Sequence, residues 1–270
     1  MTLPTYAMDQ VTFPQMYERW LVGPLFRPWA ELTVEELGLS AGDRVIDIAC
    51  GTGIVARMAR QALGDAAHVV GVDVSPAMLQ VARTIAPDID WREGSASSLP
   101  LHGGEQFDAV ICQQGLQFFA DKPAAALQMR RALVPGGKLA VSTWRCDDEM
   151  PFFRELRGVA ERHLGVIADE RYGYGDAGAL DALLRDAGFQ ELRLRKLSRT
   201  MRFDDGALFV RMNSMALVGM SGPGKAMSDA ERQRTVEAIA SDSAEVLRAH
   251  TSEGALVCEL STNFATARGG

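Results

Sequence analysis

The chain has 270 residues, 47% of them hydrophobic and 23% charged, a composition typical of a soluble globular protein with one sizeable core. Its formal net charge of −7 argues against a nucleic-acid or anionic-membrane partner. The sequence has no uncharged apolar run of about eighteen residues, which argues against a membrane-spanning helix. With no signal-peptide pattern in the first ten residues, we expect a cytoplasmic protein.

Apolar residues at helical spacing over 13–39 predict one or two N-terminal helices, broken around Gly23-Pro24 and Arg27-Pro28. Strands and helices then alternate up to Trp144. Strands are expected over 43–50, 67–74, 89–95, 107–114 and 138–144, and helices over 53–64, 75–86 and 122–134. A turn at 135–137 is expected to end the last of these helices. The apolar strands separated by helices predict a Rossmann-like, doubly wound α/β sheet.

After Trp144 the alternation becomes less regular. Helices are expected over 151–165 and 176–189, a strand over 190–203, irregular helical structure over 205–252 with a glycine-rich loop at 220–229, and a closing strand over 255–268. The pattern divides the chain into three parts. They are an N-terminal helical segment (1–40), a core (41–197 and 253–270) and a helical insertion (198–252).

The segment VIDIACGTGIVAR, residues 45–57, reads as a buried strand, a glycine turn and the start of a helix. Gly51, Gly53 and Ala56 match the pattern of a dinucleotide-binding turn, and Asp73 follows at the expected distance. The glycines would also suit a plain strand-to-helix turn. Taken alone, this match does not identify the ligand.

Asp47 distinguishes between the possible ligands because it precedes the turn by four residues, at the end of the first strand. A pyrophosphate beside that carboxylate would be repelled, by about 4 kcal/mol at ~4 Å and an effective dielectric near 20. An ammonium or sulfonium group would be attracted, while Asp73 suits the two hydroxyls of a ribose. We therefore expect S-adenosylmethionine as the cofactor, although Asp47 would also serve as a helix cap.

Five segments resemble, in order and spacing, the class I S-adenosylmethionine-dependent methyltransferases, most closely the branch related to ubiquinone and menaquinone biosynthesis. They are VIDIACGTG, VVGVDVSPAML, EGSASSLPL, FDAVICQQGLQFF and MRRALVPGGKLAVSTW. The resemblance is specific over residues 43–145. It implies a seven-stranded sheet whose last strand is antiparallel, and methyl transfer to a small molecule.

The resemblance also implies a role for each matching residue. Gly51 and Gly53 would let the backbone approach the methionine arm, Asp73 would hold the ribose, and the carbonyls of Ala49 and Gln113 would accept from the ammonium. Contacts to the adenine ring are implied for Val74, Met78, Ser95 and Ala96. Met78 suits the apolar core equally well. Ser95 replaces a frequent aspartate of the family, which predicts a contact weaker by about 1 kcal/mol.

Aromatic and amide side chains near the strand tips and in the N-terminal segment are the candidates for binding the methyl acceptor. Tyr17 is expected to reach the cofactor or the acceptor, and Trp20, Phe26, Gln114, Gln117 and Trp144 to line the acceptor site. The N-terminal residues would equally suit a helix packed on the sheet. No residue is assigned as a general base.

The expected acceptor is planar or lipophilic, from quinone or secondary metabolism, and is methylated on O, N or C. We expect a monomer or homodimer, no metal, and surface roles for the four histidines. Two alternatives remain at this stage. One is a non-catalytic sensor or scaffold that binds S-adenosylmethionine, and the other is an NAD-dependent oxidoreductase, which Asp47 disfavours.

Overall fold

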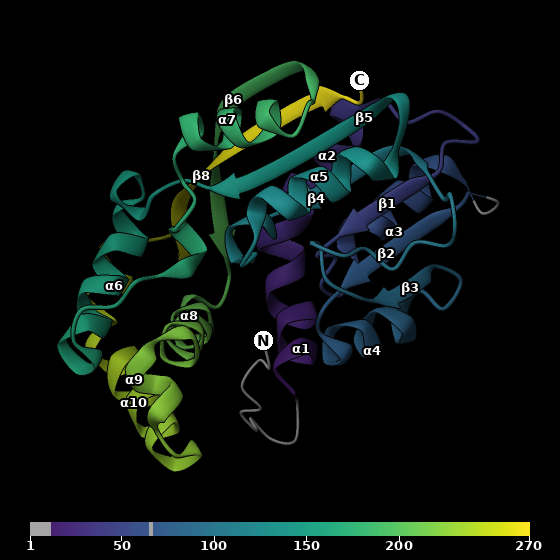
Figure 1. Cartoon of the computed structure of the whole chain (residues 1–270). Coiled ribbons are helices and arrows are strands. Elements are labelled where there is room, and N and C mark those ends of the chain that lie inside the picture. The colour runs from purple at the N-terminus through teal and green to yellow at the C-terminus, as the bar shows by residue number, and fades with distance from the viewer. Residues whose placement is uncertain (1–11, 65–66) are drawn as a thin grey trace.

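The computed structural model describes residues 12–64 and 67–270, and its centre is one twisted, mostly parallel sheet (Figure 1). The strand order is β3-β2-β1-β4-β5-β8-β6, with the two-residue β7 added beside β8. β8 runs antiparallel to both β5 and β6, so the prediction of a seven-stranded path with a reversed last strand is confirmed. The strands are β1 (Val45–Ile48), β2 (Val69–Asp73), β3 (Asp90–Glu93), β4 (Phe107–Gln113), β5 (Leu133–Trp144), β6 (Gln190–Phe203), β7 (Thr251–Ser252) and β8 (Ala255–Arg268).

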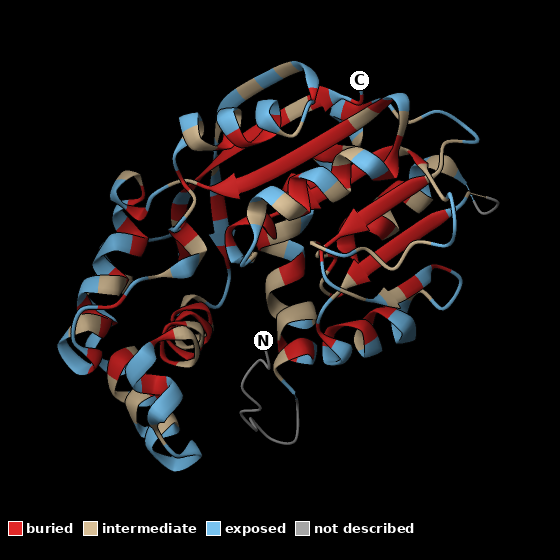
Figure 2. Ribbon diagram, viewed as in Figure 1, coloured by how far each residue is buried: buried red, intermediate tan, exposed pale blue. Residues whose placement is uncertain are grey.

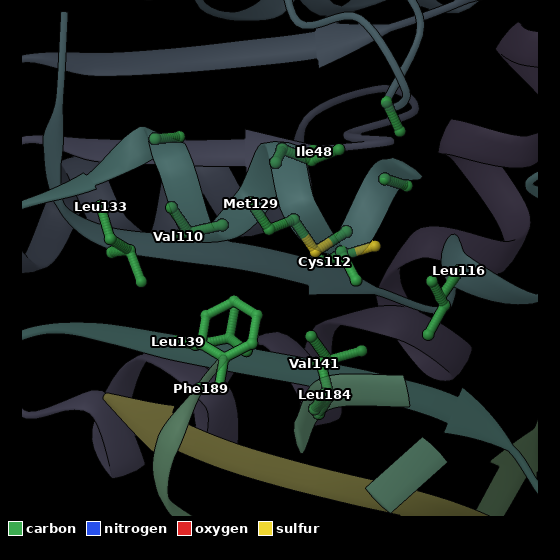
Figure 3. Close-up of a cluster of buried hydrophobic side chains, with 14 of the residues drawn as sticks. Ile48, Val110, Cys112, Leu116, Met129, Leu133, Leu139, Val141, Leu184 and Phe189 are labelled. Carbon is green, nitrogen blue, oxygen red and sulfur yellow. The ribbon is translucent and has the colours of Figure 1, made fainter. Parts of the chain in front are cut away.

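Helices cover both faces of this sheet, as expected for a doubly wound fold. The apolar sides of α5 (Lys122–Ala132) and α7 (Ala177–Asp186) pack on one face, where Figure 3 shows Val110, Leu139 and Leu184 meeting. On the other face lie α2 (Arg27–Leu37), α3 (Ile54–Leu63) and α4 (Pro76–Ile85). Strands β1, β2, β4 and β8 are buried almost throughout (Figure 2). The edge strand β6 is mostly exposed or half-buried.

The N-terminal helices run without the breaks predicted at Gly23-Pro24 and Arg27-Pro28, so that prediction was wrong. α1 (Phe13–Met16) continues into a π-helix, η1 (Tyr17–Phe26), and then into α2. The wider π-turn accommodates Pro24, and Pro28 lies in the first turn of α2, where no helical N–H is needed. Residues 1–11, in which no signal peptide was expected, lie outside the described residues.

The segment 135–137 was predicted as a turn that ends a helix, but it lies inside β5. Residues 134–137 form a wide bulge opposite Asp108, because Leu133 pairs with Phe107 and Lys138 pairs with Ala109. The Gly136 N–H donates to the carbonyl of Gly269 at 2.9 Å. A contact with a segment more than 130 residues away therefore keeps these residues in the sheet.

The region after β6 is helical, as predicted. It contains α8 (Gly206–Met220), α9 (Gly222–Ala226), α10 (Asp229–Asp242) and α11 (Ala244–Ala249), and it packs on α6 (Pro151–Leu164). Short 3-10 turns η2 (Leu116–Phe118), η3 (Asp147–Glu149) and η4 (Glu170–Tyr172) complete the chain. None of the described helices has the length and apolar character needed to cross a lipid bilayer.

One detail differs from the expectations for this region. The 220–229 segment is not all loop, because Ser221 caps α9 by accepting the Gly224 N–H at 3.0 Å, with Pro223 in the first turn. Strand β6 ends at Phe203 and α8 begins at Gly206, which agrees with the strand expected over 190–203 and the helical structure expected from residue 205.

Candidate active site

The turn between β1 and α3 contains Ala49, Gly51 and Gly53. Ala49 has a φ of 59°, in the left-handed region that residues other than glycine seldom adopt. The Gly53 N–H donates to the Cys50 carbonyl at 2.8 Å, which tightens the turn. The Thr52 hydroxyl is buried and has no hydrogen-bond partner among the described residues. The turn thus places the first amides of α3 and an unused hydroxyl at the carboxyl end of β1.

Asp47 carries a buried carboxyl group beside this turn. It is 1% exposed and accepts the Ala56 N–H at 3.1 Å, so it does contact the first turn of α3. Burial raises the pKa of Asp47 to about 8; the Ala56 amide opposes this rise, and the charge of Asp73 adds to it. No cationic side chain pairs with Asp47 within the described part of the chain. When Asp47 is ionised, its negative charge is therefore uncompensated, and a positively charged group of a ligand can pair with it.

Asp73 ends β2 and connects it to the glycine turn. Its Oδ2 accepts the Gly51 N–H and its Oδ1 accepts the Ser75 N–H, each at 2.8 Å. Burial raises the pKa of Asp73, while the amides of Ser75, Gly51 and Val74 oppose this rise. Ser75 itself caps α4 by accepting the Met78 N–H at 3.4 Å. Asp73 is thus held in a fixed orientation, with further lone pairs on both oxygens.

The indole of Trp91, in β3, lies against the glycine turn, a contact that the sequence analysis missed. A Cβ atom on Gly53 would lie 2.2 Å from this ring, and one on Gly71 would lie 2.3 Å from it. The indole N–H donates to the Ala86 carbonyl at 2.7 Å. Gly71 was the available signal, because a glycine inside a strand often marks such a close approach.

The four residues expected to contact an adenine ring differ in exposure. Val74 is 55% exposed and offers an open apolar surface next to Asp73, whereas Met78 is 7% exposed and Ala96 is buried in the core. The Ser95 hydroxyl lies 2.9 Å from that of Ser97. The arrangement brings Val74 and Asp73 together, and it leaves Ala96 committed to packing.

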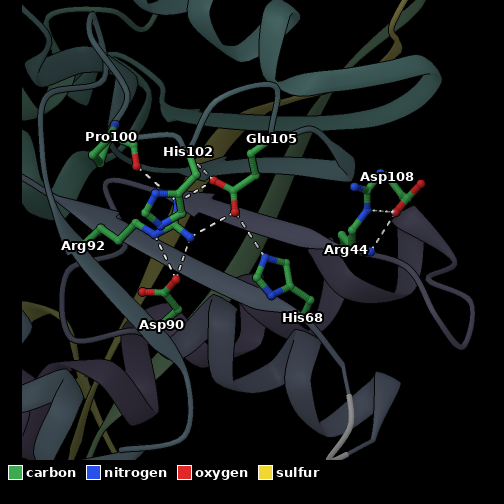
Figure 4. Close-up of polar contacts among 8 residues, drawn as sticks. All are labelled: Arg44, His68, Asp90, Arg92, Pro100, His102, Glu105 and Asp108. Atoms are coloured by element: carbon green, nitrogen blue, oxygen red, sulfur yellow. Dashed lines mark hydrogen bonds and ion pairs between the residues drawn. The ribbon is translucent and has the colours of Figure 1, made fainter.

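An ion-pair network braces the loop that follows Ser95 (Figure 4). Arg92 donates to Glu105 at 2.6 Å and holds the pKa of this carboxyl down at about 2. The His102 N–H donates to Glu105 at 3.1 Å, and the His68 imidazole lies 3.3 Å from the same carboxylate. These two histidines therefore contact a structural carboxylate at the loop.

Tyr17, the first residue of η1, brings the N-terminal helices to the glycine turn. A Cβ atom on Gly51 would lie 3.9 Å from the Tyr17 hydroxyl. Burial and the nearby charges of Asp73 and Asp47 raise the pKa of Tyr17, so its phenol stays neutral and can donate a hydrogen bond. Tyr17 thus faces the same carboxylates as the turn.

A partly buried ion pair joins this helix to α3, since the Arg57 Nη2 lies 2.9 Å from the Glu18 Oε1. Replacing Glu18 with glutamine is expected to lower the free energy of unfolding by about 1 kcal/mol, because Arg57 loses its charged partner. Urea denaturation measures this change. Glu31→Gln is the control: its 4.0 Å pair with Arg27 is exposed and should contribute almost nothing. Equal losses in both variants would contradict the prediction.

The ends of β4 and β5 bring the predicted glutamines together. The Gln113 Nε2 donates to the Phe26 carbonyl at 3.3 Å, which joins β4 to the N-terminal helices. Gln114 has a φ of 55°, and its Nε2 donates to the Thr262 hydroxyl at 3.0 Å. Gln117 is 5% exposed, and both of its amide atoms lack a partner among the described residues. Strained backbone and unmatched buried polar groups of this kind concentrate at functional sites.

Aromatic rings connect these strand ends to the glycine turn. Ring centroids are 5.0 Å apart for Tyr17 and Phe26, 6.3 Å for Phe26 and Trp144, and 5.9 Å for Trp144 and Trp29. Trp20 lies apart from this series and packs against the apolar cluster of α6, α8 and α10. The structure thus brings four of the six aromatic and amide candidates to the side of the glycine turn: Tyr17, Phe26, Gln114 and Trp144. Trp20 faces the helical region, and Gln117 lies in η2, just after β4.

Two cavities lie away from these residues. One, of about 450 Å³, is lined by Phe152, His250 and Glu259 among others, and the second, of about 300 Å³, by Asp147 and Tyr172 among others. Neither cavity includes a residue of the glycine turn or of the strand tips. We therefore place the candidate site on the buried carboxylates and unmatched polar groups.

A family model described as a methyltransferase domain matches residues 45–137 of the chain. The chain is 30% identical over 185 residues to a 2-phytyl-1,4-naphtoquinone methyltransferase of Thermosynechococcus vestitus, covering 63% of this chain and 82% of that protein. It is 31% identical over 186 residues to a demethylmenaquinone methyltransferase of Renibacterium salmoninarum, covering 64% and 77% respectively.

Among solved structures, one similar fold is a Haemonchus contortus phosphoethanolamine N-methyltransferase in complex with phosphomonomethylethanolamine and S-adenosylhomocysteine. The TM-score is 0.58 at 17% identity, and the match covers 94% of this chain and 55% of that one. At this identity the likeness concerns the fold alone.

Proposed function

Because the chain belongs to the class I S-adenosylmethionine-dependent methyltransferases of the quinone-biosynthesis type, we propose that its methyl acceptor is a quinone-like aromatic molecule of quinone or secondary metabolism. The protein is an enzyme that methylates a small molecule with S-adenosylmethionine as the cofactor. The aromatic series from Tyr17 to Trp29 supports the proposed class of acceptor, since flat rings pack well on such surfaces.

We further propose that the cofactor lies over the glycine turn. The observation that carries this proposal is the buried carboxyl of Asp47, which has no cationic partner in the described part of the chain. Asp47 suits the charged methionine arm, and the free lone pairs of Asp73 suit the ribose hydroxyls. The remaining proposed contacts come from Tyr17, Ala49, Gly51, Gly53, Val74, Met78, Ser95, Ala96 and Gln113.

When bound, S-adenosylmethionine supplies an activated methyl group. The residues of this chain then have to orient the acceptor and exclude water, and correct orientation is worth about 7–11 kcal/mol of a reaction barrier. We propose that the N-terminal helices act as a lid, with Tyr17 and Phe26 covering the turn, and that residues 198–252 shape the acceptor side. No side chain is assigned as a general base.

The test of the cofactor site is a calorimetric titration with S-adenosylhomocysteine, with NAD as the matched control. At pH 8.5, where Asp47 is ionised, we expect micromolar binding of S-adenosylhomocysteine and none of NAD, because the Asp47 carboxylate repels a pyrophosphate. Binding of NAD alone would overturn the assignment. If the protein binds S-adenosylhomocysteine but never transfers a methyl group to any of a panel of hydroxylated quinols, a sensor or scaffold role would replace the proposed reaction.

A further inference from the structure

Several polar groups near the ends of β4 and β5 are buried without a hydrogen-bond partner among the described residues, those of Gln117 and Thr143 included. Three more are connected by the contacts described below: the Trp29 Nε1 on α2, the Gln114 Oε1 after β4 and the Ser142 Oγ in β5. These three residues are 2%, 6% and 3% exposed, respectively. A buried polar group without a partner destabilises the folded state, and such groups in native proteins usually have a functional reason. Three of them in one region therefore indicate a ligand.

Contacts between their neighbours place the three groups in one region. The Trp29 ring packs edge-on against Trp144, 5.9 Å between centroids, and Ser142 precedes Trp144 by two residues on the same face of β5. The Gln114 N–H donates to the Ser142 carbonyl at 2.9 Å. The Gln114 Nε2 donates to Thr262, which pairs with Trp144 across the sheet.

This region adjoins the glycine turn. A Cβ atom on Gly115, the residue after Gln114, would lie 2.5 Å from the Cβ of Ala49. The ring series from Trp144 through Phe26 reaches Tyr17 beside the turn. A molecule bound at the three groups would therefore lie next to the proposed position of the cofactor.

The hydrogen-bonding capacity of the groups indicates what they bind. The Trp29 indole only donates, the Gln114 Oε1 only accepts, and the Ser142 hydroxyl does both. All three are neutral. Arg199 lies over the face of Trp29, 5.5 Å from its centroid, so the indole N–H at the ring edge stays available. Such a set matches a hydroxyl or carbonyl oxygen on an apolar ring better than it matches a carboxylate or phosphate.

We propose that Trp29, Ser142 and Gln114 are the side chains that bind the ring oxygens of the methyl acceptor. This inference rests on the proposed function, because it deepens the assignment of the acceptor side of the same site. It also explains why Ser142 keeps a hydroxyl that has no partner among the described residues.

The test uses protein saturated with S-adenosylhomocysteine and two probes, 1,4-dihydroxynaphthalene under argon and naphthalene. Trp29→Phe and Ser142→Ala should each weaken dihydroxynaphthalene binding about two- to tenfold, the value of one neutral hydrogen bond. Ser142→Ala should leave naphthalene binding unchanged, and it should raise the melting temperature because it removes an unmatched buried hydroxyl. The control is Ser214→Ala, at a serine that is equally buried but bonded to the Val210 carbonyl at 2.9 Å.

If Ser142→Ala binds both dihydroxynaphthalene and naphthalene more weakly than the wild type, the inference is wrong. It is also wrong if the variant binds both probes as well as the wild type does. Failure of dihydroxynaphthalene to bind the wild type would also overturn it. Binding of S-adenosylhomocysteine is measured first in every variant, and the probe titrations are repeated without it. If the wild type does not bind S-adenosylhomocysteine, the proposed function is contradicted, whatever the titrations with the two acceptor probes show.

Discussion

Replacing Asp73 with alanine is expected to weaken binding of S-adenosylhomocysteine about ten- to a hundredfold, which corresponds to charged hydrogen bonds worth ~1.5–3 kcal/mol. Two effects add in this variant. The proposed contacts to the ribose hydroxyls disappear, and the Gly51 and Ser75 amides lose the carboxylate that joins them. Calorimetric titration measures the change in affinity.

Two further variants separate these effects. Asp73→Asn keeps one oxygen acceptor for the amides but loses the charge, so it should retain the turn and show most of the loss in affinity. Asp88→Ala removes a carboxylate that pairs with Arg60 at 2.8 Å, outside the proposed site, and should bind normally. Unchanged affinity in a folded Asp73→Ala variant would refute the ribose assignment.

Replacing Asp47 with asparagine is expected to have opposite effects on stability and on binding. Burial raises the pKa of this carboxyl to about 8 in the folded protein, against 3.8 for an aspartate in water. The folded state therefore holds an extra proton between these values. The free energy of unfolding should fall with rising pH across this window, by up to about 1.4 kcal/mol per pH unit, and level off above pH 8. Asp47→Asn should remove this fall and be the more stable protein at pH 8.5.

Binding should show the reverse trend, because the ammonium group of the ligand's homocysteine arm favours the ionised form of Asp47. Wild-type affinity for S-adenosylhomocysteine should rise from pH 6 to pH 8 with release of a proton, and Asp47→Asn should bind weakly at every pH. The titratable groups facing Asp47 are Asp73, Tyr17, Cys50 and Cys112. Burial raises the pKa of Tyr17 and of both thiols well above this range, so none of these three titrates within it. Burial also raises the pKa of Asp73, so the Asp47→Asn variant is the comparison that isolates Asp47.

Titrations in two buffers with different heats of ionisation would count the protons released on binding. A wild-type affinity that is flat from pH 6 to pH 8, or that matches the pH profile of Asp47→Asn, would contradict the role of this carboxyl. A variant that binds as well as the wild type while gaining stability would show that Asp47 serves the helix alone, through the Ala56 amide.

The positions of most strands along the chain and the residues of the glycine turn were accessible from the sequence because they are local. Apolar runs of strand length, separated by capped helices, predicted β1, β2, β4 and the second half of β5, and alternating charges predicted β6. Asp47 and Asp73 lie near the strand ends where they were expected. Local patterns perform well where each segment's own preference agrees with the fold.

The predictions that were wrong or missing depend mainly on contacts with residues that are distant in the sequence. The glycines at 136 and 137 read as a turn until the paired strand at Gly269 is known, and the Trp91 ring reaches Gly53 from another strand. Pro24 reads as a break because a π-turn has no sequence pattern that distinguishes it from a kink. Whether the Ser142 hydroxyl has a hydrogen-bond partner depends on all the residues around it, and these come from distant parts of the sequence.

The reversed strand β8 has a consequence for synthesis of the protein. It lies between β5 and β6, but it follows the helical region 206–249 in the chain. During translation β5 and β6 therefore emerge without the strand that joins them, and each keeps an exposed edge until some fifty more residues have been made. The nascent chain is then open to pairing with other chains, and closure of the sheet by a late, long-range step is the stage at which a chaperone would matter most.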